Sequence, residues 1–263
     1  MVEHLTGDTR LYPIIGDPVA FVKSPQTLSA GFAARGKNAL CIPMQVAKGD
    51  LAPVMDALAR TRNVEGLLIT MPHKVEAFRF CASSDRTSAL LGCVSVMRRN
   101  ADGTWHGGML DGQAFLKAQV DQGAKPHGAR ALLIGAGAAG SAIAVALLEA
   151  KVGELVVCDS EPSRAAGLIA ALDRIEKGQS RQGSADPAGF DLVCHATPMG
   201  LNDTDPLPID VHRLQRATFV GDVIAGHGTT PLIQAARRYG CGTATGAQMV
   251  DAVQEMMLDF LEV

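Results

Sequence analysis

Three glycines near the middle of the chain have the spacing of a dinucleotide-binding turn. Gly135, Gly137 and Gly140 form a G-x-G-x-x-G motif between an apolar run at residues 131–134 and an alanine-rich stretch. In such a motif the first glycine permits a tight turn, the second lets the backbone approach a pyrophosphate, and the third lets helix and strand pack closely. The N-terminal N–H groups of the following helix would bind the phosphates. The predicted loop is completed by Ala136, Ala138 and Ala139.

An acidic residue completes this pattern. Asp159 follows a second apolar run at residues 155–158 and lies 24 residues after Gly135. A carboxylate at the end of the second strand accepts the ribose hydroxyls of NAD and would repel a 2′-phosphate. The pattern therefore predicts NAD rather than NADP as the cofactor. The alternative is a glycine-rich turn that binds no ligand.

Oxidation of an alcohol also needs a base for the hydroxyl proton, and the first half of the chain offers two candidates. Lys74 comes shortly after an apolar run at residues 66–70. Asp111 follows Gly107 and Gly108, which we interpret as a hinge between two domains. Together, a lysine and an aspartate at the edge of a cleft could hold a hydroxyl group and move its proton. Taken singly, each would be interpreted as an ordinary surface charge.

The elements that must position these residues alternate between strands and helices. This alternation predicts an α/β protein of two domains: residues 1–107 form a substrate-binding domain, completed by a C-terminal helix at 247–263, and residues 108–246 form a Rossmann-type, doubly wound NAD-binding domain. Ser24 is the expected N-cap of the first helix, and residues 176–189 are expected to form a loop. Strands are expected at residues 11–15, 39–43, 66–70, 94–99, 104–107, 131–134, 155–158, 192–196 and 218–223, and helices at 25–35, 51–61, 75–80, 164–174, 231–238 and 247–261.

Composition argues against several classes of function. The 263 residues are 47% hydrophobic, which is enough for sizeable cores. A net charge of −3 and an aromatic content of 4% give no basis for binding nucleic acid or an anionic membrane. We expect a cytoplasmic protein because no secretory leader or membrane-spanning apolar run is present. The six cysteines lack C-x-x-C spacing and read as reduced core residues. The histidines lack metal-ligand spacing, so no metal is predicted.

The order of seven motifs along the chain resembles the shikimate/quinate dehydrogenase family. The motifs are GDPVAFVKSP, ITMPHK, WHGGMLDG, GAGAAG, HATPMG, DVIAGHGTTP and TGAQM. The resemblance implies reversible oxidation of a ring hydroxyl of shikimate, quinate or a related hydroxy acid, with Lys74 and Asp111 as the catalytic pair. A monomer or homodimer is expected. Two alternatives remain, namely an NAD-binding family member with another substrate and a non-catalytic nucleotide-sensing protein.

The resemblance also assigns substrate and cofactor positions, with departures. Ser24 and Thr70 are kept, whereas Val22 and Val253 fall where the family has a serine and a glutamine. The other expected substrate contacts are Ser95, in the place of a family asparagine, Gln254, Lys74 and Asp111. NADP-dependent members carry Asn-Arg-Thr at the place where this chain has Asp159, Ser160 and Glu161. This difference again favours NAD. The expected cofactor contacts are Gly135, Ala136, Gly137, Ala138, Ala139, Asp159, Ser160, Arg164, Thr197, Met199, Val223, Gly246 and Met249.

Two histidines lie in these motifs without an assigned chemical role. His73 precedes Lys74 and is interpreted as a loop residue rather than as the base. His195 occupies a family asparagine position at the end of an expected strand, and we interpret it as a structural histidine whose ring nitrogens are hydrogen-bonded.

Overall fold

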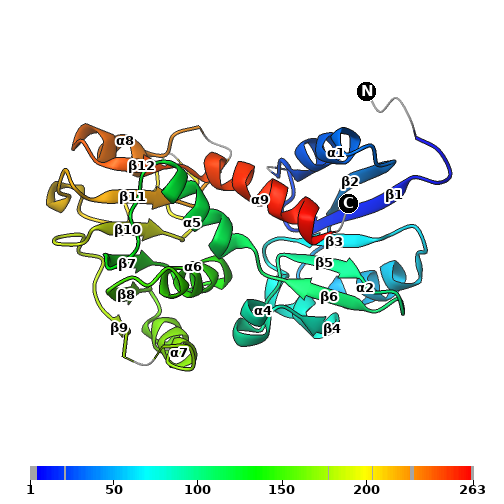
Figure 1. Cartoon of the computed structure of the whole chain (residues 1–263), viewed down its shortest axis with the longest axis horizontal. Helices are drawn as coiled ribbons and strands as arrows, with labels where there is room; N and C mark the ends of the chain where they lie inside the picture. The colour runs from blue at the N-terminus through cyan, green and yellow to red at the C-terminus, as the bar shows by residue number, and fades with distance from the viewer. Residues whose placement is uncertain (1–4, 21, 177, 203, 226–227, 262–263) are drawn as a thin grey trace. The chain divides into compact units, whose positions relative to one another are not determined.

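The chain forms two compact units (Figure 1). The computed structural model describes residues 5–20, 22–176, 178–202, 204–225 and 228–261. The first unit comprises Met1–Leu110 and Gln254–Val263, and the second comprises Asp111–Val253. The predicted two-domain α/β architecture is confirmed. The chain passes between the units at Leu110, shortly after the glycine pair that we interpreted as a hinge.

The first unit is built on a mixed sheet. Its strand order is β2-β1-β3-β5-β6-β4, in which β1 pairs in parallel with β2 and β3, while β5 is antiparallel to β3 and β6. The strands are β1 (Arg10–Gly16), β2 (Ala39–Gln45), β3 (Gly66–Ile69), β4 (Cys81–Ser84), β5 (Val96–Arg99) and β6 (Trp105–Gly108). The helices are α1 (Ser24–Ala34), α2 (Leu51–Arg60), α3 (Lys74–Ala77), continued by a 3₁₀ turn at Phe78–Phe80, and α4 (Arg86–Leu91).

The core of this unit follows from the apolar pattern. All four residues of β3 are buried, as expected for a central strand that is covered on both faces. On α2, Leu51, Met55 and Leu58 are buried at the i, i+4, i+7 spacing of a helix that presents one apolar face. One local prediction is wrong: Ser24 is not the N-cap of α1. Lys23 is the N-cap, and Ser24 already lies in the first helical turn.

The second unit is a doubly wound parallel sheet. Its strand order is β12-β11-β10-β7-β8-β9, and neighbouring strands pair in parallel throughout. From β7 the chain adds β8 and β9 on one side, and it then returns to add β10, β11 and β12 on the other side. The boundary between β7 and β10 is therefore the switch point, where such folds bind nucleotides. The strands are β7 (Arg130–Ile134), β8 (Glu154–Cys158), β9 (Ser180–Gln182), β10 (Leu192–His195), β11 (Phe219–Asp222) and β12 (Gly242–Ala244). The helices are α5 (Asp111–Asp121), α6 (Ala138–Glu149), α7 (Pro162–Leu172) and α8 (Pro231–Arg238).

Helix α6 is buried on nearly all sides, which explains its alanine-rich sequence. A Cβ at Gly112 would overlap the carbonyl of Ala142, so this glycine allows α5 to pack closely against α6. Residues 176–189 were predicted to be a loop, which is wrong for β9 because this short strand pairs with β8.

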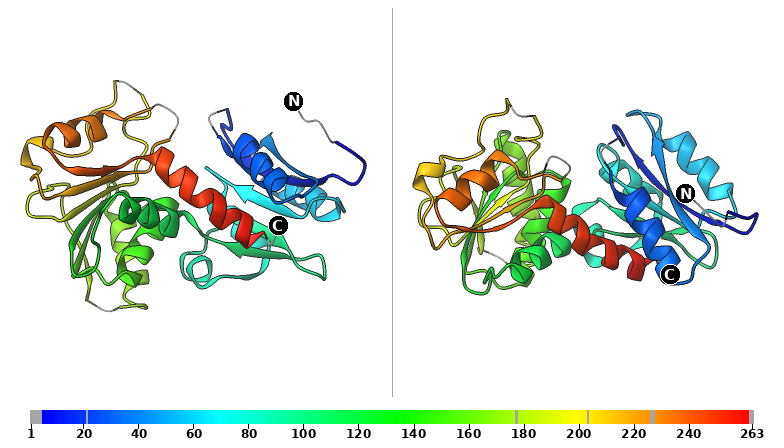
Figure 2. Two further views of the ribbon diagram at one scale, coloured as in Figure 1. Left: turned by 45° about the horizontal axis from the view of Figure 1, so that its top comes forward. Right: turned by 90° about the horizontal axis from the view of Figure 1, so that it is seen from above.

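The C-terminal helix α9 (Gly246–Phe260) begins in the second unit and ends in the first. In the first unit its last turns lie beside α1 (Figures 1 and 2). Gln254 Nε2 donates to the carbonyl of Thr27 at 3.0 Å, and Leu258 fills the space that Gly31 leaves on α1. Within the described residues, no helix is long and apolar enough to span a membrane.

Candidate active site

The structure explains each of the three motif glycines differently. Gly135 has a φ of 104°, and a Cβ there would meet the carbonyl oxygen of Ala196 at 2.6 Å. A Cβ at Gly140 would overlap the carbonyl of Gly135. Gly137, the N-cap of α6, has a φ of −75° and nothing within 4 Å of a Cβ built on it. The fold therefore needs the first and third glycines, whereas the open space at the second suits a phosphate ligand at a helix N-terminus.

The loops around this turn meet at the carboxyl edge of the sheet. Gly135 N donates to the carbonyl of Cys158, and Ala196 N donates to that of Ile134, both at 2.8 Å. A Cβ at Gly246 would overlap the carbonyl of Ile224, so α9 starts close to the segment after β11. The structure thus gathers the loops after β7, β8, β10 and β11. These loops and the starts of α6 and α9 carry the predicted cofactor residues Ala136, Ala138, Ala139, Asp159, Ser160, Thr197, Met199, Val223 and Met249.

Asp159 does not present a free carboxylate to a ribose. Its Oδ2 accepts a hydrogen bond from Ala136 N at 2.7 Å, and its Oδ1 accepts one from Glu161 N at 2.8 Å. Asp159 therefore fixes the glycine turn against the end of β8. Arg164, in the first turn of α7, pairs with Glu161 at 2.8 Å, and both side chains are more than half exposed.

A buried polar network joins the ends of β10 and β11. His195 Nδ1 lies 3.0 Å from Asp222 Oδ1, and His195 Nε2 lies 2.6 Å from Thr197 Oγ1. Thr230 donates to Asp222 Oδ2 at 2.6 Å. His195 is fully buried and Asp222 is 1% exposed. Both ring nitrogens of His195 are therefore hydrogen-bonded, as predicted. The sequence left Asp222 and Thr230 without a role, although both lie in a recognised motif.

In the first unit, the loops after β1 and β3 are held side by side. Thr70 N donates to the carbonyl of Ile15 at 2.9 Å, and Asp17 N donates to that of Met71 at 2.8 Å. A Cβ at Gly16 would overlap the Thr70 side chain, so this glycine lets Thr70 approach β1. Thr70 is half-buried at the carboxyl end of β3.

Lys74 begins α3 immediately after this loop. Its carbonyl accepts a hydrogen bond from Val94 N at 2.9 Å, and its side chain is half-buried. The preceding residue, His73, is 1% exposed, and its Nε2 lies 2.7 Å from the carbonyl oxygen of Val46. His73 is therefore a fixed part of the loop, as predicted, and it helps to set the position of Lys74.

Two side chains hold the segment that leads to Asp111. Asp85 Oδ2 accepts a hydrogen bond from Met109 N, and Ser95 Oγ accepts one from Leu110 N, each at 3.0 Å. Ser95 is 1% exposed and Asp111, the first residue of α5, is 6% exposed. We expected Ser95 to touch the substrate; in the structure its hydroxyl oxygen positions the chain just before Asp111. Sequence reasoning missed Asp85, because nothing in the sequence ties it to Met109.

The remaining predicted substrate residues lie on α1, on the loop before it and on α9. Val22 and Ser24 are half-buried at the start of α1. Val253 ends the second unit and Gln254 resumes the first, and both are half-buried. The Gln254 side chain is used to hold α9 on α1.

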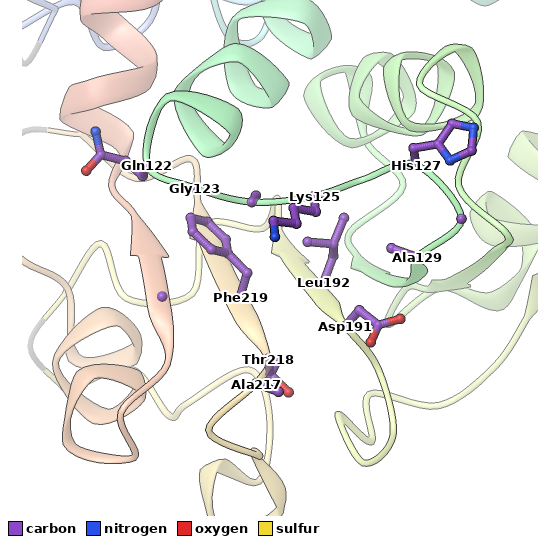
Figure 3. A pocket seen from close by; sticks show the side chains of 13 residues that line it. Gln122, Gly123, Lys125, His127, Ala129, Asp191, Leu192, Ala217, Thr218 and Phe219 are labelled. Carbon is purple, nitrogen blue, oxygen red and sulfur yellow. The ribbon is translucent and has the colours of Figure 1, made fainter.

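An open depression of about 570 Å³ lies at the opposite edge of the second sheet (Figure 3). Leu192, Phe219 and Gly242, the first residues of β10, β11 and β12, line it together with Lys125 and Asp191. None of the predicted site residues borders it. Among the residues that the structure describes, no group of three or more His, Cys, Asp or Glu side chains could hold a metal ion.

Comparisons with known proteins agree with the motif order. Residues 14–97 match the family described as shikimate dehydrogenase substrate binding domain. The chain is 34% identical to the shikimate dehydrogenase (NADP(+)) of Rubrobacter xylanophilus, over 95% of this chain and 89% of the relative. Among solved structures, quinate dehydrogenase from Corynebacterium glutamicum in complex with NAD is 26% identical, with a TM-score of 0.87 over 96% of this chain and 93% of that one.

The prediction that NAD is the preferred cofactor is wrong. The curated relatives in Rubrobacter, Geobacter, Moorella and Acidiphilium, 30–34% identical to this chain, are all named shikimate dehydrogenase (NADP(+)). The structural reason lies in Asp159. Because both of its oxygens accept main-chain N–H groups, the carboxylate is committed to the turn and its charge is partly offset. The sequence shows the acid but not this orientation.

Proposed function

Because the chain belongs to the shikimate dehydrogenase family, we propose that it is an NADP-dependent oxidoreductase that interconverts a hydroxyl and a ketone on a shikimate-like ring acid. The observation that carries this proposal is the turn at Gly137, where the space beyond the N-terminus of α6 is open for a pyrophosphate. When bound, NADP⁺ would accept the hydride from the ring carbon.

The proton of the substrate hydroxyl would be handled by Lys74 and Asp111. The Lys74 amine would hold the hydroxyl and take its proton, and the Asp111 carboxylate would orient the amine and the hydroxyl. Lys74 is fixed at the start of α3 through its carbonyl and through buried His73. Asp111 follows directly on Leu110, whose N–H is bound by Ser95. Such anchoring supports a catalytic role because proton transfer needs hydrogen-bond geometry.

The 2′-phosphate of NADP would be bound at the start of α7. Arg164 lies in its first turn, and Ser160 lies in the short connection between β8 and α7. The exposed ion pair between Arg164 and Glu161 is weak, so the guanidinium can exchange its partner for a phosphate. The N-terminal N–H groups of α7 would add favourable charge.

The substrate is expected to differ from shikimate in one respect. Ser24 and Thr70 offer hydroxyls for a carboxylate and a ring hydroxyl, whereas Val22 and Val253 offer apolar surface in the places of a family serine and glutamine. A ring acid with apolar bulk at these points would bind better than shikimate, because it leaves no polar group unpaired. That the protein is a cytoplasmic monomer or homodimer remains a prediction.

The test is the reduction of NADP⁺ by the purified protein with a panel of ring hydroxy acids that includes shikimate and quinate. We expect absorbance at 340 nm to rise with at least one of them. A protein that binds NADP but turns over no member of the panel would instead favour the non-catalytic nucleotide-sensing alternative.

A further inference from the structure

We propose that His195 is a positioning residue for the nicotinamide half of the dinucleotide, acting through the hydroxyl of Thr197. The inference rests on the proposed function, and it concerns a residue that departs from the family pattern. Its basis is the buried network at the ends of β10 and β11, in which both nitrogens of His195 have partners.

The hydrogen bonds of this network can be ordered from the chemistry of each group. The Asp222 carboxylate only accepts, so Nδ1 of His195 must carry the proton that faces Oδ1. In a neutral ring Nε2 is then an acceptor, and the Thr197 hydroxyl must donate to it across 2.6 Å. Thr197 Oγ1 remains free to accept from Met199 N at 3.1 Å. Each donor in this series therefore faces an acceptor, from Met199 N through Thr197 and His195 to Asp222. These bonds fix the side-chain rotamer of Thr197.

The same network fixes the neighbouring loop. Asp222 Oδ1 also accepts from Ile224 N at 3.0 Å, and Oδ2 accepts the hydroxyl proton of Thr230. Thr230 is the N-cap of α8 and accepts from Ile233 N. One buried ring therefore links the segment after β10 to the segment after β11 and to the start of α8.

The position of the network in the sheet indicates which half of the dinucleotide it serves. In a doubly wound sheet the dinucleotide crosses the switch point, with one mononucleotide on each side. The glycine turn and the α7 end of the site follow β7 and β8 on one side. His195 and Asp222 end β10 and β11 on the other side, so Thr197 and Met199 face the nicotinamide half.

An asparagine at position 195 could replace only part of this device. Its amide atoms match Nδ1 in distance from the main chain, so it can reach Asp222, but it has no atom at the place of Nε2. The amide of a glutamine lies as far from the main chain as Nε2, so it can reach Thr197 but has no atom at the place of Nδ1. The pair of variants therefore separates the contact with Asp222 from the contact with Thr197.

The experiment compares His195→Asn, His195→Gln and His195→Ala with the unmodified protein and with a control, His212→Ala. His212 lies in the same unit, but its Nδ1 lies beside the hydroxyl of exposed Tyr239 and not in the buried network. Calorimetry would measure the Kd of NADP and of 2′,5′-ADP, a fragment without nicotinamide. Steady-state kinetics would measure kcat, and thermal unfolding would check the fold.

We expect His195→Asn and His195→Ala to weaken NADP binding about tenfold, the size of a lost hydrogen bond at the strong end. The kcat should fall about 10–100-fold because the nicotinamide is misplaced. The affinity for 2′,5′-ADP should stay within about twofold, because this fragment lacks the nicotinamide half and loses no hydrogen bond that depends on Thr197. His195→Gln should recover most of the loss, and His212→Ala should change nothing.

Two results would overturn the inference. If 2′,5′-ADP affinity falls together with NADP affinity, the network supports the whole unit and not the nicotinamide half. If NADP affinity and kcat are unchanged in His195→Asn, Thr197 does not depend on the ring. Should His195→Ala fail to fold, the Asn and Gln variants still decide the question. If the unmodified protein turns over a substrate and the variants give either result, this inference alone is contradicted. If the unmodified protein binds no NADP, the proposed function is contradicted as well.

Discussion

At the residue scale, the motifs identified the types of group but not the direction in which they point. From their spacing, Gly135 was predicted to permit a tight turn and Gly140 to permit close packing, and in the structure a Cβ at either position would meet a main-chain carbonyl. Asp159 was assigned to the ribose from the same kind of pattern, yet both of its oxygens bind main-chain N–H groups. Which hydrogen-bond donor a carboxylate meets depends on loop geometry that the sequence does not encode in any periodicity. That is why the reasons for Gly135 and Gly140 could be predicted from their spacing, whereas the cofactor preference could not.

The apolar substitutions at the substrate positions give a prediction at this scale. In the double variant Val22→Ser, Val253→Gln, kcat/KM for shikimate should rise about 10–100-fold, because each recovered hydrogen bond to a charged or strongly polar group contributes about 1.5–3 kcal/mol and the two are not expected to add fully. Val19→Ser, in the loop before α1, serves as the control. Unchanged kcat/KM for shikimate in the double variant would mean that other side chains already bind its polar groups.

At the element scale, long and strongly apolar segments were predicted well and short edge elements were not. The buried strands β3, β7 and β8 and the helix α8 were located because their apolar runs or apolar faces are continuous. Strands β4, β9 and β12 were missed, since they are short and partly exposed at or near sheet edges. Helix α5 was missed because it begins with an aspartate and a glycine directly after the segment that we interpreted as a hinge.

The glycine turn makes the sharpest prediction about an element. Gly137→Ala should leave the free energy of unfolding unchanged or slightly higher, because its φ and the open space allow a methyl group. It should nevertheless weaken NADP binding by about tenfold or more, since the methyl group would occupy the pyrophosphate position. Gly140→Ala should instead destabilise the unit by about 1–3 kcal/mol, because the Cβ overlaps the Gly135 carbonyl.

Chemical denaturation and calorimetry with NADP would measure both effects, with Gly167→Ala as the control. Gly167 is exposed on α7 and also has open space around a Cβ. If Gly137→Ala binds NADP as the unmodified protein does, the phosphates do not lie against this turn, and the assignment of the cofactor site is mistaken.

At the scale of the whole molecule, the chain returns to its first unit through the end of α9. Leu258 is 1% exposed and contacts Gly31 on α1, while Arg35 pairs with Glu255 and Asp259. The helix itself could be predicted from its periodicity. Its packing partner could not be deduced from periodicity, because a small residue such as Gly31 gives no sign of which helix will fill the space beside it.

Leu258→Ala should therefore destabilise the first unit by about 2–5 kcal/mol, the usual cost of emptying a buried leucine site. Hydrogen exchange should quicken in α1 and β1, whereas the amides of β7 and β10 keep their protection. Asp251→Ala, exposed on the same helix, is the control. Equal loss of protection in both sheets would show that the two units do not unfold independently.

The central claim is that this chain oxidises a ring hydroxyl with NADP⁺ and that Lys74 handles the proton. The most direct measurement is kcat/KM for NADP⁺ and for NAD⁺ with the best ring hydroxy acid, in the unmodified protein and in Lys74→Ala, with exposed Lys48→Ala as the control. We expect NADP⁺ to be preferred, kcat to fall about 10²–10⁴-fold in Lys74→Ala, as for the loss of a general acid–base group, and the Kd of NADP to stay unchanged. If Lys74→Ala keeps more than about a tenth of the turnover, the loss is smaller than a general acid–base group contributes, and the account is contradicted. Equal kcat/KM with NADP⁺ and NAD⁺ in the unmodified protein would contradict it as well.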